Sequence, residues 1–107
     1  MATIPPKPYR RMKQQHPDLF AAVEALGEVL KGQGPIEEKN AQLIQLAAAA
    51  AIRSEGAVHS HARRALDAGA SPAEVHHALL LLTSTIGFPG VMAASSWADD
   101  VMVSDEG

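Results

Sequence analysis

The sequence predicts an all-α protein, and three observations support that fold class. Apolar residues make up 47% of the 107 residues but aromatic residues only 4%, so the core must be built from small and aliphatic side chains. Five consecutive alanines, residues 47–51, favour a helix because alanine is the strongest helix former. Apolar residues recur at three- and four-residue spacing, and no useful stretch alternates like a strand. We expect one domain, a bundle of about five to six helices.

The first clear helix is expected to begin at Pro17 and to end before Gly32. Proline is favoured in a first helical turn, and the carboxylate of Asp18 complements the helix dipole there. The apolar residues of this helix share one face: Leu19, Phe20, Val23, Leu26, Val29 and Leu30. Residues 1–16 are rich in proline and basic side chains, and we expect an extended arm or a short helical lead-in there. The chain is thus divided into an arm, 1–16, and a helical domain, 17–107.

Two further helices are predicted from the next turn signals. A Gly34-Pro35 break precedes a helix expected over residues 37–53. Its alanine run is apolar all round, so this segment should be central and tightly packed. The following helix is expected over about 57–68, ending at Gly69, where glycine can adopt a left-handed cap.

The sharpest local signal in the chain is Ser71-Pro72-Ala73-Glu74, which reads as a capping box with proline in the first turn. The helix that starts there should end near the Gly87-Phe88-Pro89 break. A last helix is expected from Val91 to about Val101.

Composition excludes several function classes. The net charge is −3 and the chain has no long basic stretch, so neither nucleic acid nor an anionic membrane is an expected partner. No apolar run reaches the ~20 residues of a membrane span, and no apolar signal core opens the chain, so a cytoplasmic protein is expected. The absence of cysteine excludes disulfides, thiol nucleophiles and Fe–S clusters. A chain this short gains stability by burying helix faces between subunits, which predicts a homo-oligomer.

Histidines are the groups best suited to proton transfer near neutral pH. His61 is the most interesting of the five, because it lies at the edge of the apolar stripe formed by Val58, Ala62 and Ala65. Small neighbours leave space there for a pocket in which the ring could donate or accept a proton. The alternative is a core-edge imidazole satisfied by a backbone carbonyl, or a residue at a subunit interface.

The remaining histidines indicate no metal site by their spacing. His59 and His61 point to different sides of their helix, about 200° apart. Of the adjacent His76 and His77, one exposed ring and one interface ring are expected. These four rings could bind zinc, copper or nickel only by meeting across helices or subunits, so no metal and no cofactor are predicted. Forked hydrogen bonds from arginine could hold a carboxylate substrate, and the candidates are Arg53, Arg63 and Arg64.

The order of residues in three blocks resembles the carboxymuconolactone decarboxylase family, whose members include AhpD-like proteins. The blocks are Leu43–Ala51, then His61–Ser71 followed by Glu74-Val75, and finally Gly87-Phe88-Pro89. The resemblance covers about residues 18–100. It implies an AhpD-like all-helical fold that assembles as trimers or hexamers, with subunit contacts helping to build the pocket.

The peroxidase branch of that family carries a glutamate, then Cys-x-x-Cys, then a histidine four residues after the second cysteine. Anchored on His61, this pattern places the cysteines at Ser54 and Ala57 and the glutamate at Gln42. Thiol-based peroxide reduction needs one thiolate to attack and a second thiol to resolve the product. Serine and alanine do neither, so the chain is not a peroxidase by that mechanism.

The decarboxylase branch is similar to this chain around the His-x-Arg-x-Ala block, and it removes a carboxylate from a lactone. The resemblance implies a cofactor-independent decarboxylase or related lyase acting on a small lactone or keto acid. His61 would be the general acid, Arg53 or Arg63 would anchor the carboxylate, and Gln42 would occupy the glutamate position. Two alternatives stay open: a non-catalytic oligomeric protein that binds a small ligand, and the histidine-based metal assembly.

Overall fold

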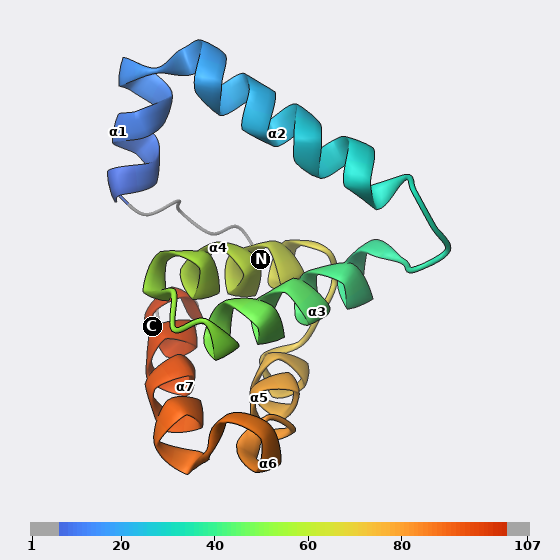
Figure 1. Cartoon of the computed structure of the whole chain (residues 1–107), viewed down its shortest axis with the longest axis vertical. Helices are drawn as coiled ribbons and strands as arrows, with labels where there is room; N and C mark the ends of the chain where they lie inside the picture. The colour runs from blue at the N-terminus through green and yellow to red at the C-terminus, as the bar shows by residue number, and fades with distance from the viewer. Residues whose placement is uncertain (1–6, 103–107) are drawn as a thin grey trace.

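The computed structural model describes residues 7–102, and within that range the protein is entirely helical, with no strand. Six of the segments are longer helices and α6 is a short one of four residues. Their bounds are α1 (Lys7–Gln15), α2 (Pro17–Lys31), α3 (Glu38–Ala51), α4 (Glu55–Asp67), α5 (Pro72–Leu80), α6 (Thr83–Ile86) and α7 (Phe88–Met102) (Figure 1). The all-α prediction is confirmed. Residues 7–15 of the expected arm form α1, and residues 1–6 lie outside the described part.

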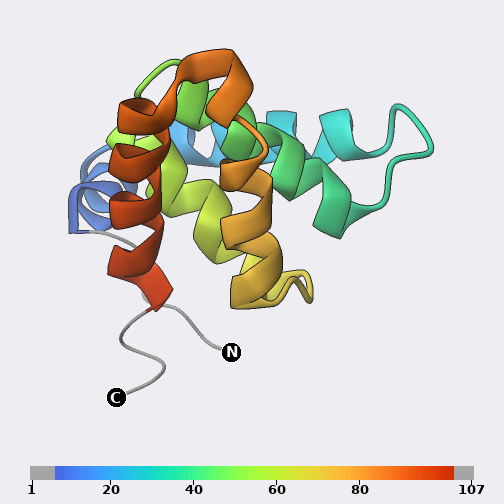
Figure 2. The ribbon, with the colours of Figure 1, turned by 90° about the horizontal axis from the view of Figure 1, so that it is seen from below.

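The core lies among α3, α4, α5 and α7, hereafter the bundle. Helix α4 packs on α3 and α7, while α5 packs on the same two helices. Figure 2 shows α5 and α7 running side by side, joined at one end by α6. Small side chains fill this core, as the composition predicts, and its largest fully buried members are Leu46, Leu79, Val58, Val75, Val91 and one polar residue, Gln42.

Helices α1 and α2, hereafter the α1–α2 segment, bury no residue at all. They pack on each other and lie on the side of the bundle formed by α3 and α4 (Figure 1). The expected apolar face of α2 exists, but five of its side chains are 54–58% exposed: Leu19, Val23, Leu26, Val29 and Leu30. The sequence pattern therefore predicts the helix, whereas one chain alone does not cover the face.

The predicted turn and cap signals are present in the structure. Pro17 lies in the first turn of α2, and Gly69 has φ 103°, the left-handed conformation expected of it. The capping box is complete, because the Ser71 hydroxyl accepts the Glu74 N–H at 3.1 Å. In return, the Glu74 carboxylate accepts the Ser71 N–H at 2.9 Å.

Three predicted boundaries are wrong. The helix expected over 37–53 ends at Ala51, and Arg53 takes φ 58° in the connection to α4. The single helix expected after Ser71 is interrupted at Leu81, so α5 and α6 are separate. Helix α7 begins at Phe88, because Pro89 fits a first helical turn, where its missing N–H costs no hydrogen bond.

The alanine run is central on only one side. Ala49 and Ala50 are buried at 3% and 2% exposure, whereas Ala48 and Ala51 are exposed. The expectation of a central, tightly packed segment therefore holds for one face only, because α4, α5 and α7 cover only the inner face of α3. Within residues 7–102, no helix is both long enough and apolar enough to cross a membrane.

Candidate functional site

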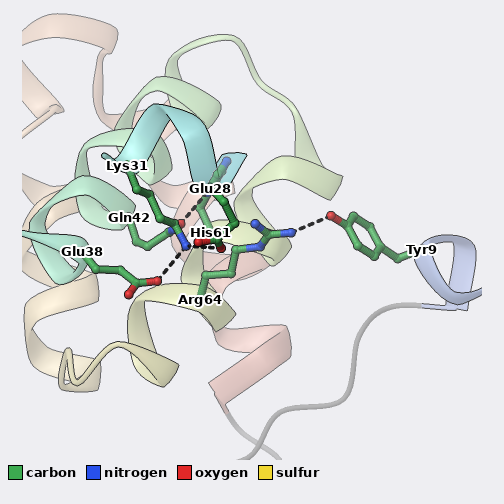
Figure 3. A network of polar contacts seen from close by, with 7 residues as sticks. All are labelled: Tyr9, Glu28, Lys31, Glu38, Gln42, His61 and Arg64. Carbon is green, nitrogen blue, oxygen red and sulfur yellow. Dashed lines mark hydrogen bonds and ion pairs between the residues drawn. The ribbon is translucent and has the colours of Figure 1, made fainter. Parts of the chain in front are cut away.

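His61 occupies the middle of α4, where its ring is half-buried. The neighbouring stripe formed by Val58, Ala62 and Ala65 is fully buried, so the prediction of a core-edge position is confirmed. The ring Nδ1 lies 2.9 Å from Oε1 of Gln42, a residue of α3 that is only 1% exposed (Figure 3). An amide oxygen only accepts hydrogen bonds, so Nδ1 carries the proton and donates it. In the neutral ring, Nε2 is therefore left as the proton-accepting atom.

The surroundings of His61 favour its neutral form. Burial lowers the pKa of the ring below its usual value of 6.5, and the positive charge of Arg64 lowers the pKa further. At pH 7 the ring is therefore mostly neutral in the free protein. A neutral imidazole fixed at Nδ1 is suited to proton exchange through Nε2.

Two cavities meet at His61. The smaller one, about 230 Å³, lies between α2 and the helices α3 and α4, and combines apolar side chains of α2 with polar groups. Its walls include Val23, Leu26, Leu30, Lys31, Gln42, His61 and Arg64. The larger one, about 720 Å³, lies between α1 and the first turns of α4 and is bordered by Pro8, Tyr9, Glu55, Ala57, His59 and His61.

Tyr9 of α1 borders both cavities and ties the α1–α2 segment to α4. Its hydroxyl accepts a hydrogen bond of 2.8 Å from Nη2 of Arg64 (Figure 3). The guanidinium carbon of Arg63 lies 5.6 Å from the centre of the Tyr9 ring, and Phe20 meets that ring edge to face at 5.0 Å. Sequence reasoning missed Tyr9, because a lone tyrosine in an arm matches no motif.

The three candidate arginines occupy different environments. Arg64 borders the smaller cavity, and it is the arginine whose charge acts on His61. Arg63 is buried at 6% exposure and faces the Tyr9 ring, and it borders neither of the two cavities at His61. Arg53 is exposed in the α3–α4 connection, away from both cavities. The structure thus brings Gln42 and Arg64 to His61, but not Arg53.

Lys31 adds a second cation to the wall of the smaller cavity. Its Nζ lies 2.7 Å from Glu38 and 3.3 Å from Glu28 (Figure 3). The hydrogen bond to Glu38 is the main reason why the pKa of Lys31 is raised. Because two carboxylates already pair with this ammonium group, Arg64 is the better candidate for holding an anion in the cavity.

Two of the other histidines, His59 and His76, each contact a different carboxylate. His59 lies 2.9 Å from Asp100, and His76 lies 2.7 Å from Asp99. His77 is exposed, so the expectation of one exposed ring in this pair is confirmed. Within residues 7–102 of one chain, the four rings His59, His61, His76 and His77 do not form a common metal site.

Comparison with known protein families gives one result that covers most of the chain. The model of the carboxymuconolactone decarboxylase family matches residues 17–100. The chain belongs to this family. Searches of curated proteins and of solved structures found no match.

This member of the carboxymuconolactone decarboxylase family has no cysteine, which removes the thiol chemistry of the peroxidase branch. The two positions that the resemblance assigns to cysteine serve the helix instead. The Ser54 hydroxyl caps α4 by accepting the N–H of Ala57 at 3.4 Å, as expected of a helix-end residue. The family match begins at Pro17, so Tyr9 and α1 lie outside it.

Proposed function

We propose that the protein is a decarboxylase-type lyase that acts on a small carboxylated lactone or keto acid without a bound cofactor. The observation that supports this best is the His61–Gln42 pair, because a half-buried ring oriented through Nδ1 lies where two cavities meet. Membership of the carboxymuconolactone decarboxylase family supports the reaction class.

The reaction needs a place for an electron pair and a source for one proton. When the bond between the substrate and its carboxylate breaks, carbon dioxide leaves and the electron pair is delocalised onto the neighbouring carbonyl. Protonation of the resulting carbanion completes the reaction. In the proposal the carboxylate of the bound substrate favours the charged imidazolium, so that Nε2 of His61 takes a proton from solvent and then gives it to the carbanion. Gln42 positions the ring by accepting the hydrogen bond that the Nδ1–H of His61 donates.

An anionic substrate also needs a cation that orients it. Sequence reasoning proposed Arg53 or Arg63 for this role, whereas the cavity favours Arg64, which borders it beside His61. A guanidinium group can hold a carboxylate through two parallel hydrogen bonds. In the proposal Arg64 orients the substrate, and the apolar side chains of α2 cover its hydrocarbon part.

The test is ultraviolet-monitored turnover of carboxymuconolactone by the wild-type protein and three variants. His61→Ala should abolish turnover. Gln42→Ala should reduce turnover about 10- to 100-fold, as expected of a group that orients a functional ring. His77→Ala is the control, because that ring is exposed. Circular dichroism and the oligomeric state should be unchanged in each variant. Turnover that survives in His61→Ala would refute the role of His61, and no turnover by the wild type would refute this substrate.

A non-catalytic binding protein is the second candidate, and it is supported by the apolar lining that α2 contributes to the smaller cavity. Such a protein would bind carboxymuconolactone or a related small carboxylate without changing it. Calorimetry with the same compound separates the candidates, because binding without turnover favours the second.

We further propose that copies of the chain assemble through the exposed apolar face of α2, as a trimer or hexamer. Five side chains more than half exposed along one helix form a surface typical of a protein–protein contact. Assembly would bury the face that one chain leaves in water.

A further inference from the structure

We propose that Glu55, His59 and Asp100 form a binding site for a divalent transition-metal ion at the edge of the larger cavity. This goes beyond the proposed function, which needs no metal. His59 and Glu55 come from the first two turns of α4, and Asp100 comes from the last turn of α7. One ligand atom of each residue lies within 4.8 Å of the others.

The distances around His59 fit a coordinated ion. Its Nε2 lies 2.9 Å from Oδ2 of Asp100 and 3.9 Å from Oε2 of Glu55. Ligand atoms held about 2.1 Å from a zinc ion at tetrahedral angles lie roughly 3.4 Å apart, a value between these two distances. The Glu55 side chain is 57% exposed, so it can rotate inward, whereas the His59 side chain is fixed at 16% exposure.

Charge provides an independent argument for a cation. Within residues 7–102, neither Glu55 nor Asp100 pairs with a lysine or an arginine. Both carboxylates point at the ring of His59 instead. Two carboxylates meeting at one imidazole leave negative charge that a divalent ion would neutralise.

The donor set indicates the class of ion. One imidazole nitrogen and two carboxylate oxygens suit zinc, manganese, iron or cobalt better than calcium, which takes oxygen ligands. Glu55 and His59 also border the larger cavity, so an ion there would keep open positions for water or for an anionic ligand.

The chain contains a matched control for this site. His76 and Asp99 form a pair of the same kind, 2.7 Å apart between α5 and α7, but within residues 7–102 no second carboxylate joins them. A histidine–aspartate pair alone should attract a metal only weakly, whereas a three-ligand site should bind it much more strongly. Comparing variants of the two pairs therefore distinguishes a specific three-ligand site from weak metal binding by any histidine–aspartate pair on the surface.

The test is isothermal titration calorimetry with Zn²⁺. It uses tag-free protein from which metals have been removed with EDTA followed by dialysis. The wild type should bind one ion per chain. His59→Ala, Asp100→Asn and Glu55→Gln should each weaken that binding at least tenfold, while His76→Ala should leave it within twofold. Circular dichroism checks that every variant is folded.

Three outcomes would overturn the site: no wild-type binding below 1 mM Zn²⁺, unchanged binding in His59→Ala, or equal weakening by His76→Ala. Unchanged binding in Glu55→Gln would reduce the site to a histidine–aspartate pair and overturn the three-ligand proposal. None of these results depends on whether carboxymuconolactone is turned over, so failure of this site and failure of the proposed function are distinguishable.

Discussion

The α1–α2 segment and the bundle both contain amphipathic helices, but they differ in how much of each apolar face is buried. Helix α2 buries none of its residues, whereas α4 buries six of thirteen. The difference lies in what each apolar face meets, because α4 packs on α3 and α7 whereas the apolar face of α2 stays exposed.

That contrast shows that helical periodicity predicts a helix and its apolar face, but not the partner of that face. In the bundle the partner belongs to the same chain. Within the described residues the α1–α2 segment makes few contacts with the bundle. The main ones are the polar contacts of Tyr9 and Lys31 and the wall of the smaller cavity. The predictions below test this division between a self-contained bundle and a segment that needs a partner.

The largest expected effect is on the core of the bundle. Leu46 is fully buried, so Leu46→Ala should lower the free energy of unfolding by about 2–5 kcal/mol. The matched substitution on the segment is Leu26→Ala, at a side chain 57% exposed, and in dilute monomeric protein it should change that free energy by less than about 0.5 kcal/mol. Urea unfolding followed by circular dichroism measures both. Equal losses would show that α2 is part of the core.

The next effect concerns assembly. Val29→Glu places a charge on the exposed apolar face of α2 and should dissociate the proposed oligomer while the helix content is retained. Ala21→Glu is the control, because Ala21 lies about 140° around the helix from Leu26. Sedimentation velocity gives the mass of each variant. An oligomer that survives Val29→Glu would contradict assembly through this face.

A smaller effect is expected where the segment is attached to α4. Tyr9→Ala removes the hydrogen bond from Arg64, the cation–π contact with Arg63 and the edge-to-face contact with Phe20. Amide hydrogen exchange in α2 should therefore become roughly tenfold faster. Tyr9→Phe removes the hydroxyl alone and should have a lesser effect. Exchange measured by mass spectrometry would contradict this attachment if α2 were unaffected by Tyr9→Ala.

The smallest effect is a pH dependence within the bundle. The N–H of Ser71, followed by the ammonium group of Lys39, lowers the pKa of the Glu74 carboxyl below its usual 4.5. A carboxyl whose pKa is lower in the folded state contributes stability above its unfolded pKa and loses that contribution as the pH falls through its folded pKa. Glu74→Gln should therefore destabilise the protein at pH 7, and this difference should shrink as the pH falls below 4.5. Thermal unfolding over a series of pH values from 7 downward measures this, and an equal effect at every pH would exclude the charge as the cause.

Signals that act over a few residues could be predicted from the sequence. The capping box at Ser71, the left-handed Gly69 and the first turn at Pro17 depend on neighbouring residues only, and all three are present. The core-edge position of His61 followed from helical periodicity, since the stripe beside it had to face inward.

Contacts between distant segments could not be predicted in this way. The resemblance assigned Gln42 a place in the site, but only the packing of α3 on α4 brings it to His61. Tyr9 and Arg64 are 55 residues apart in the sequence, and His59 and Asp100 are 41 residues apart. Helical periodicity relates only residues of the same helix, so it cannot predict such pairs. The choice among three arginines was unresolved for the same reason, because the cavity that favours Arg64 is formed by side chains of α1, α2, α3 and α4.

The most direct test of the central claim, that Gln42 orients His61 for proton exchange at Nε2, is the tautomer of the His61 ring. Nitrogen-15 NMR of the metal-free protein in EDTA, above the pKa of the ring, identifies which nitrogen carries the proton. The account predicts a proton on Nδ1 of His61 in the wild type and loss of that preference in Gln42→Ala. A proton on Nε2 in the wild type, or a tautomer unchanged by Gln42→Ala, would contradict it.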